Sequence, residues 1–260
     1  MYMSSIVEMI TYLNLLLLLV ALGLLAFTLH KVRRIHLKQY DADTLSDLRI
    51  DNLFSQIEAL TAIQQDLALS VSLPATRGWA ASPDFLRHIA RTAADTLPLN
   101  VVECSSGAST IVLAKVMQKN GVGHVFSLEH EPFYANKTRQ EIRRQGLQAF
   151  ATVIDAPLRS HSLSGGEWKW YETKDLPKSI DLLVIDGPPA SVQSLARYPA
   201  IPVLDASISR TGCVMLDDAN RPDERAALLR WASEYAWVSA EDLHAEKGIA
   251  KLNRNSSTVQ

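Results

Sequence analysis

The sequence predicts an α/β protein in which a mainly parallel β-sheet carries helices on both faces. Between residues 83 and 235, short apolar runs alternate with longer stretches whose apolar residues recur every three or four positions. This alternation is typical of parallel strands joined by helical crossovers. The chain has 260 residues, 47% of them hydrophobic, which is enough to bury one sizeable core. We therefore expect one main domain, at residues 73–254.

Charge and cysteine content exclude several classes of protein. The formal net charge is -2 and no basic face is visible in the sequence, so a nucleic-acid partner is not expected. The two cysteines, Cys104 and Cys213, each lie in an apolar run that reads as a core strand. We expect them to be buried thiols, with neither a disulfide framework nor a zinc site.

The N-terminal region is typical of a membrane anchor. Residues 6–29 are almost entirely apolar, with Asn14 as the strongly polar exception, and about 20 such residues can span a bilayer. Glu8 precedes the run, whereas the basic residues follow it: Lys31, Arg33, Arg34 and Lys38. A cleaved signal peptide has the opposite order of charge. We expect residues 1–30 to be a single-pass anchor in the cell (inner) membrane, with the domain in the cytoplasm.

Residues 31–72 are expected to be a basic juxtamembrane segment followed by a helical linker. A helix over residues 39–70 would carry an apolar stripe, the leucine stripe: Leu45, Leu48, Leu53, Ile57, Leu60, Ile63 and Leu67. Two roles remain open for it. It forms a homodimer as a short coiled coil through residues 45–67, or it packs on its own domain.

The remaining elements follow in order. Ser82 and Pro83 predict a helix start, because serine favours the N-cap and proline the first helical position. Strands are expected near 100–104, 124–128, 150–154, 181–186 and 212–217, and helices near 83–96, 109–119, 133–145, 191–208 and 222–235. Residues 237–243 and 248–252 read as an antiparallel hairpin at the sheet edge, and the polar residues 255–260 as a loose tail.

Candidate functional residues lie at the strand ends, where ligands bind in a doubly wound sheet. The first strand runs into a turn of small residues, Glu103–Thr110, whose backbone N–H groups can approach a ligand. Glu129 ends the second strand, where an acid can accept both hydroxyls of a ribose. The later strands end at Asp155, Asp186 and Asp217–Asn220. Gly107 is the one glycine in the turn, so a Gly-x-Gly-x-x-Gly pyrophosphate cradle is not expected.

These motifs, in this order and spacing, resemble the class I S-adenosylmethionine-dependent methyltransferases, and more closely a bacterial branch with a membrane-anchored N-terminus. The resemblance covers roughly residues 78–252. It rests on the turn at 103–110, Ser127–His130, Asp155-Ala156, Asp181–Pro189, Arg197–Ala200 and Leu216–Ala219. It implies a Rossmann-like sheet of seven strands that ends in the antiparallel hairpin.

The resemblance also implies roles for individual residues. The methionine portion of S-adenosylmethionine would lie among Glu103, Ser105, Ser106, Gly107 and Ser109. Glu129 would bind the ribose diol, and Asp155 and Ala156 would lie beside adenine. Asp186 would face the site of methyl transfer. The chain departs from the family pattern where Ser105 and Ser109 replace the usual second and third glycines.

A divalent cation such as Mg²⁺ is a further expectation from the resemblance. Asp186 and Asp218 would hold it, as in metal-dependent O-methyltransferases, and it would lower the pKa of an acceptor hydroxyl. In those enzymes an asparagine follows the second aspartate directly, whereas here Ala219 precedes Asn220. Without a metal, Asp186 is either a general base or a loop anchor.

Residues 157–177 form a long connection that contains Arg159, His161, Trp168, Trp170 and Tyr171. Two alternatives remain open for it. It closes over the acceptor as a lid whose aromatic rings stack on a sugar or another ring, or the rings cover the edge of the sheet.

The sequence is thus interpreted as a methyltransferase of the EC 2.1.1 class that methylates oxygen. Its acceptor would be a small molecule, a sugar or a lipid-linked glycan at the cytoplasmic membrane face. The main alternative is a non-catalytic, membrane-anchored scaffold or assembly factor that keeps the fold. A nucleotide-dependent oxidoreductase is a third hypothesis, disfavoured by the missing glycines.

Overall fold

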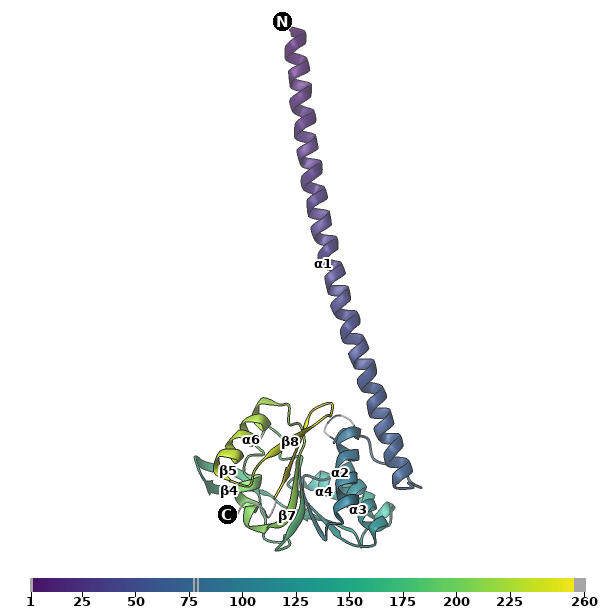
Figure 1. Cartoon of the computed structure of the whole chain (residues 1–260), viewed down its shortest axis with the longest axis vertical. Coiled ribbons are helices and arrows are strands. Elements are labelled where there is room, and N and C mark those ends of the chain that lie inside the picture. Colours follow the sequence, from purple (N-terminus) through teal and green to yellow (C-terminus); the bar gives the residue numbers. More distant parts are fainter. Residues whose placement is uncertain (1, 77, 79, 255–260) are drawn as a thin grey trace. The chain divides into compact units, whose positions relative to one another are not determined.

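The protein divides into two compact units in a computed structural model that describes residues 2–76, 78 and 80–254 (Figure 1). The first unit is Met1–Phe54 and the second is Ser55–Gln260. The second unit thus begins well before residue 73, where the sequence placed the domain boundary. The tail expected at 255–260 lies outside the described residues.

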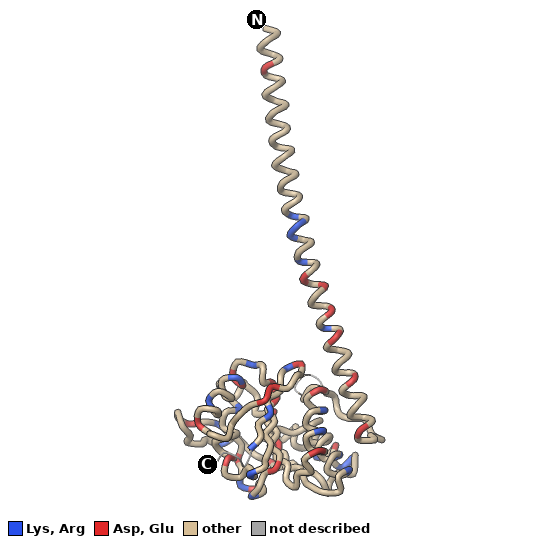
Figure 2. Tube along the Cα trace, viewed as in Figure 1, with Lys and Arg blue, Asp and Glu red and all other residues tan. Residues whose placement is uncertain are grey.

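One helix, α1 (Tyr2–Asp66), replaces the separate anchor and linker helices expected from the sequence. Among the described residues it is the one helix long and apolar enough to cross a membrane, and its apolar side chains between Ile6 and Leu29 are exposed. The basic residues that begin at Lys31 follow this apolar stretch along the helix (Figure 2). The apolar stretch and the basic residues after it, on which the anchor prediction rests, thus lie on one continuous helix.

The second unit is built on a sheet of seven strands in the order β3-β2-β1-β6-β7-β9-β8. The five strands from β3 to β7 are parallel, β9 runs antiparallel to β7, and β8 pairs antiparallel with β9. This confirms the Rossmann-like sheet with a C-terminal hairpin. The bounds are β1 (Asn100–Cys104), β2 (His124–Glu129), β3 (Ala151–Asp155), β6 (Ile180–Ile185), β7 (Ile208–Leu216), β8 (Ala240–Leu243) and β9 (Ile249–Asn253).

Helices cover both faces of this sheet. On one face lie α2 (Pro83–Thr96), α3 (Ala108–Asn120) and α4 (Pro132–Arg144), and on the other lie α5 (Ala200–Leu204) and α6 (Pro222–Glu234) (Figure 1). Successive strand residues point to opposite faces, so Val101 belongs to the apolar cluster under α2 and α3, and Val102 to the cluster under α6. Both faces of the sheet are therefore buried, as its apolar strands require.

The prediction of one helix over residues 191–208 is wrong. Residues 190–199 form turns, α5 begins only at Ala200, and a short 3₁₀ turn (Asp205–Ser207) leads into β7. Pro199 and Pro202 explain the difference. A proline has no N–H to donate and disfavours helical backbone before it, so a helix through 191–198 has no continuation.

The connection at 157–177 folds as a hairpin of β4 (Leu158–Leu163) and β5 (Gly166–Tyr171) rather than as a long loop. Trp170 and Tyr171 are fully buried in the apolar cluster under α6, and Trp168 packs against that cluster. The rings thus cover the sheet, which is the second of the two alternatives. They are not stacking surfaces of an open lid.

The leucine stripe is divided between two environments. Ile63 is 1% exposed and belongs to the core under α2 and α3, and Leu67 packs against the same cluster. Leu45, Leu48 and Leu53 are exposed. The last turns of α1 therefore pack on their own domain, and a homodimer through residues 45–67 stays a prediction.

Candidate active site

The strand order reverses between β1 and β6, and the predicted site residues gather at this point. The chain passes from β1 outward to β2 and β3, then crosses back to add β6 and β7 on the other side of β1. A doubly wound sheet has its ligand crevice at the carboxyl ends of the strands beside such a reversal. Glu103, Glu129, Asp186 and Asp217 all occupy this edge, because each lies at the carboxyl end of its strand.

The turn between β1 and α3 keeps a glycine-like backbone although it contains only one glycine. Ser105 has φ +114°, a conformation that favours glycine, and Gly107 has φ +155°. The Ser105 N–H donates to the Leu128 carbonyl at 2.9 Å, and the Gly107 N–H donates to Thr110 Oγ1 at 3.0 Å. Ser105 thus adopts a backbone conformation that is strained for a residue other than glycine.

Glu103 holds this turn in place. It is fully buried, and its Oε2 accepts hydrogen bonds from Thr110 Oγ1 at 2.6 Å and Ser127 Oγ at 2.7 Å. Burial raises the pKa of Glu103, and the hydroxyls of Ser109, Thr110 and Ser127 oppose that rise. The carboxylate therefore ties the start of α3 to β2 from behind the turn. Contact of Glu103 and Ser109 with a cofactor stays a prediction.

Glu129 lies at the tip of β2 with its carboxylate facing the same turn. Its Oε2 accepts from Ser106 Oγ at 2.9 Å, and its Oε1 accepts from the Glu131 N–H at 3.0 Å. His130 Nδ1 is 3.3 Å from Oε1. Burial alone would raise the pKa of Glu129, but the bonds from His130, Glu131 and Ser106 outweigh it and lower the pKa. The group is thus an ionised hydrogen-bond acceptor at neutral pH.

The residues expected beside adenine differ in exposure. Asp155 is exposed at the end of β3, and its Oδ1 lies 2.8 Å from Arg139 Nη2 of α4. Ala156 is fully buried, and its N–H donates to the Glu129 carbonyl at 2.8 Å. Ala156 thus fixes the backbone beside Glu129, whereas Asp155 borders the edge from the solvent side.

Tyr171 reaches the strand ends from β5. A Cβ placed on Gly187 would lie 2.5 Å from the Tyr171 hydroxyl oxygen and 3.2 Å from the Cys104 carbonyl oxygen. Only a glycine lets these groups approach so closely. The Tyr171 ring also meets His130 edge to face, with centroids 5.8 Å apart. Tyr171 thus packs against the ends of β1 and β6, in line with the alternative in which the rings cover the sheet.

Three aspartates cluster at the ends of β6 and β7. Asp186, Asp217 and Asp218 each present a carboxylate oxygen within 4.8 Å of the others. Burial raises the pKa of Asp186 to about 6, against the influence of Arg197, and burial together with the neighbouring acids raises that of Asp217. Asp186 is the most accessible of the three, with 13% of its side chain exposed against 3% for Asp218. It is thus the member of the cluster best placed to meet a ligand.

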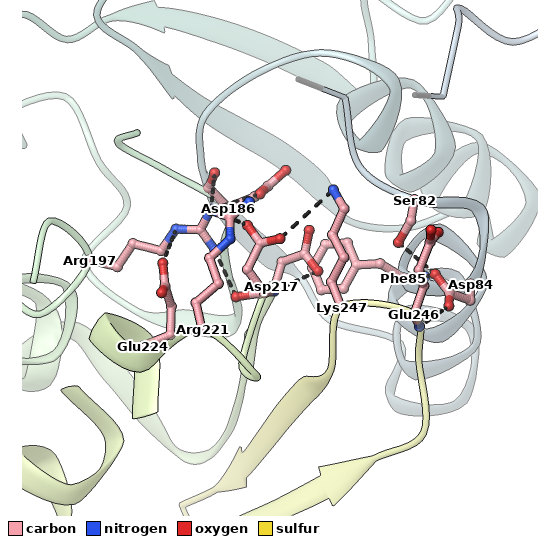
Figure 3. A network of polar contacts seen from close by, with 11 residues as sticks. Ser82, Asp84, Phe85, Asp186, Arg197, Asp217, Arg221, Glu224, Glu246 and Lys247 are labelled. Carbon is pink, nitrogen blue, oxygen red and sulfur yellow. Dashed lines mark hydrogen bonds and ion pairs between the residues drawn. The ribbon is translucent and has the colours of Figure 1, made fainter. Parts of the chain in front are cut away.

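Arg197 lies in the middle of this cluster (Figure 3). Its Nη2 is 2.6 Å from Asp218 Oδ2 and 3.3 Å from Asp186 Oδ1, and its Nη1 donates to the Asp217 carbonyl at 2.7 Å. Sequence reasoning placed Arg197 in a family motif but gave it no role. A single arginine among the apolar residues 195–201, close in sequence to Asp186, was the signal that could have indicated one.

Two more cations surround Asp218. Arg221 Nη1 is 3.0 Å from its Oδ2, and Lys247 Nζ is 3.8 Å from its Oδ1. A cavity of about 100 Å³ borders Lys247, and its other lining residues are Thr76, Gly78, Ala80, Ser82, Pro83 and Glu246. Lys247 thus connects the acidic cluster with an open space at the same edge of the sheet.

The metal ion expected at Asp186 and Asp218 does not fit this arrangement. The distances among the carboxylates would suit a shared cation. However, Arg197 Nη2 already lies within reach of an oxygen of each of these two aspartates. A cation bridging them would have to lie against a buried guanidinium.

Comparison with known proteins agrees with the fold. A family model described as a methyltransferase domain matches residues 102–219, from β1 to the end of β7. No curated protein matches the chain.

Similar solved structures include two of fungal and bacterial origin. The S-adenosylhomocysteine-bound methyltransferase PaMTH1 of Podospora anserina has a TM-score of 0.50 at 14% identity, over 75% of this chain and 86% of its own. A putative caffeoyl-CoA O-methyltransferase of Staphylococcus aureus has a TM-score of 0.51 at 14% identity, over 81% of this chain and 97% of its own. At such low identity these likenesses establish the fold.

Proposed function

We infer that this protein transfers the methyl group of S-adenosylmethionine. The inference rests on the class I S-adenosylmethionine-dependent methyltransferase fold of its domain and on the match of residues 102–219 to a methyltransferase family. We further propose that the acceptor atom is an oxygen. The acceptor would be a small molecule, a sugar or a lipid-linked glycan at the cytoplasmic membrane face.

The observation that carries the proposal is the pairing of Ser106 with Glu129. The Ser106 hydroxyl donates to Glu129 Oε2 at 2.9 Å, as a ribose hydroxyl of the cofactor would. Thr138 Oγ1 lies 3.1 Å from the same serine oxygen. Ser106 therefore keeps a partner when a ligand hydroxyl takes its place on Glu129. An ionised carboxylate at this strand end suits a nucleoside.

The chemistry requires little of the protein beyond alignment. A sulfonium is a good leaving group, so methyl transfer is an in-line displacement that depends on orientation and on the exclusion of water. The acceptor hydroxyl must also lose its proton. Asp186 would take that proton, because it is the most accessible carboxylate at the neighbouring strand end.

The N-terminal helix supports an acceptor at the membrane. The apolar stretch of α1 suits a bilayer span, and the basic residues after it favour the cytoplasmic side for the domain. A tethered enzyme meets acceptors made in or on that membrane at high local concentration.

Calorimetric titration of the full chain in detergent with S-adenosylmethionine tests the proposal. We expect binding, and we expect Glu129→Ala to weaken it by at least about 30-fold, since hydrogen bonds to a charged group contribute roughly 2 kcal/mol. Glu131→Ala is the matched control, because it removes an exposed carboxylate but keeps the backbone N–H that Glu129 accepts.

Two results would contradict the proposal. Absence of binding by a folded wild-type protein would favour the non-catalytic scaffold. A preference for NAD over S-adenosylmethionine would favour the oxidoreductase.

A further inference from the structure

We propose that the guanidinium of Arg197 takes the place of a divalent cation among the strand-end carboxylates, so that this methyltransferase works without a bound metal. The inference rests on the proposed function and names Arg197 as the residue that positions Asp186. It depends on the contacts of one side chain, on the balance of charge around it, and on the way its segment is fixed.

The contacts of Arg197 join the strand ends that would otherwise share a cation. Its Nη2 is 2.6 Å from Asp218 Oδ2, 3.3 Å from Asp186 Oδ1 and 3.2 Å from the Asp186 carbonyl oxygen. Its Nη1 binds the Asp217 carbonyl, and its Nε is 3.5 Å from Glu224 Oε1 of α6. A planar guanidinium presents five N–H donors in a rigid fork, whereas an ammonium presents three on a single rotatable nitrogen. One side chain thus binds β6, β7 and α6 together.

The charges in the cluster already balance to a large extent. Asp186, Asp217, Asp218 and Glu224 supply the carboxylates, and Arg197, Arg221 and Lys247 supply three cations. Arg197 is 5% exposed, so water screens its charge poorly. A divalent ion beside it would meet strong repulsion from the guanidinium, which is already paired with an oxygen of Asp186 and an oxygen of Asp218.

Arg197 cannot leave this position without disturbing the core. The preceding Leu195 N–H donates to Asp223 Oδ2 at 2.8 Å, and the Tyr198 carbonyl accepts from Trp231 Nε1 at 2.8 Å. Tyr198 and Trp231 are both fully buried. The segment is therefore fixed to α6 on both sides of Arg197. The guanidinium is a permanent part of the site, whereas a metal ion would exchange with solvent.

The test measures binding of Mn²⁺ to the full chain in detergent, by the loss of the electron paramagnetic resonance signal of the free ion. We expect wild type to leave the signal unchanged at millimolar Mn²⁺, and methyl transfer, once an acceptor is known, to be unaffected by EDTA. Stoichiometric binding that Asp218→Asn abolishes would overturn the proposal. The Mn²⁺ titration requires no enzymatic activity. Failure of S-adenosylmethionine to bind would therefore contradict the proposed function but would not decide whether Arg197 replaces a metal ion.

Removal of the guanidinium provides the converse test. Arg197→Met leaves the carboxylates without their central cation, and we expect it to bind Mn²⁺ at least tenfold more tightly than wild type. Arg225→Met is the matched control, because Arg225 pairs with Asp242 instead of the cluster. A folded Arg197→Met protein with no gain in affinity would contradict the proposal. If that variant does not fold, the wild-type titration alone decides between the two readings.

Discussion

At the scale of single residues, the turn at Ser105 shows how the site tolerates a departure from the family pattern. The backbone there has φ +114°, which costs a non-glycine residue roughly 1–3 kcal/mol. The hydrogen bond from its N–H to Leu128 and the packing of Gly187 nearby hold it in that conformation. The serine is therefore held in a conformation that a glycine would adopt without strain.

This strain predicts that Ser105→Gly stabilises the protein. Glycine adopts φ +114° without a steric cost but loses about 0.4–1 kcal/mol through the greater freedom of its unfolded chain. We expect a net rise of about 1 kcal/mol in the free energy of unfolding, measured by urea denaturation in detergent. Ser105→Ala separates the loss of the hydroxyl from the relief of strain. A fall in stability for the glycine variant would show that the turn is not strained.

Sequence reasoning located Glu129 and Asp186 because strand alternation alone places residues at strand ends. It did not find the role of Arg197. That residue contacts Asp186 and Asp218 at sequence separations of 11 and 21, and α5 and β7 lie between Arg197 and Asp218. Contacts of this kind follow from tertiary packing, which local spacing does not encode.

At the scale of elements, Asp84 connects three segments at the start of α2. Its Oδ2 accepts from Gln56 Nε2 of α1 at 2.8 Å and from the Glu246 N–H at 2.6 Å. Its Oδ1 accepts from Ser82 Oγ at 2.5 Å and from the Phe85 N–H at 2.8 Å. Ser82 is the N-cap residue of α2, as expected, but its hydroxyl donates to Asp84 and does not accept from a backbone N–H of the first turn (Figure 3).

Asp84→Asn is expected to lower the free energy of unfolding by about 2 kcal/mol at pH 7. The NH₂ group of the asparagine would replace one carboxylate oxygen and could not accept the hydrogen bonds that this oxygen accepts. Burial opposes ionisation of Asp84, but the bonds from Ser82, Glu246, Gln56 and Phe85 outweigh it and lower the pKa. A folded pKa below the unfolded one gives stability that is complete above the unfolded value of about 4 and is lost as pH falls through the folded value.

The difference between wild type and Asp84→Asn should therefore shrink as the pH falls below about 4. Denaturant titrations across that range measure it, with Asp95→Asn, an exposed site in the same helix, as control. A gap that stays constant with pH would mean that the charge of Asp84 does not stabilise the fold.

The prolines explain where element prediction failed. The helix predicted at 191–208 rested on apolar spacing, but Pro199 and Pro202 stop it, and the turn before them brings Arg197 into the site. The hairpin β4–β5 has no clear signal in the sequence, because its strands lie outside the main sheet and pair only with each other. Strands of the parallel sheet appear in the sequence as clear apolar runs, whereas the strands of the β4–β5 hairpin do not.

At the scale of the whole molecule, the basic residues after the apolar stretch of α1 predict the side of the membrane. We expect the domain to resist protease added to intact bacterial spheroplasts and to be digested once they are lysed. Neutralising Lys31, Arg33, Arg34 and Lys38 with glutamine removes the charge bias, so a fraction of the chains should become accessible in intact cells. Digestion of the wild-type domain in intact spheroplasts would reverse the predicted orientation.

The burial of Ile63 and the bond from Gln56 to Asp84 have a practical consequence for truncation. A shortened gene that starts at residue 73 would discard Ile63, leave a hole beneath α2 and α3, and deprive Asp84 of a donor. Losing a buried isoleucine costs about 2–5 kcal/mol, which is much of the stability of an ordinary domain. Crystallisation trials of an anchor-free version therefore have to start upstream of Ser55, so that the final turns of the long helix remain attached.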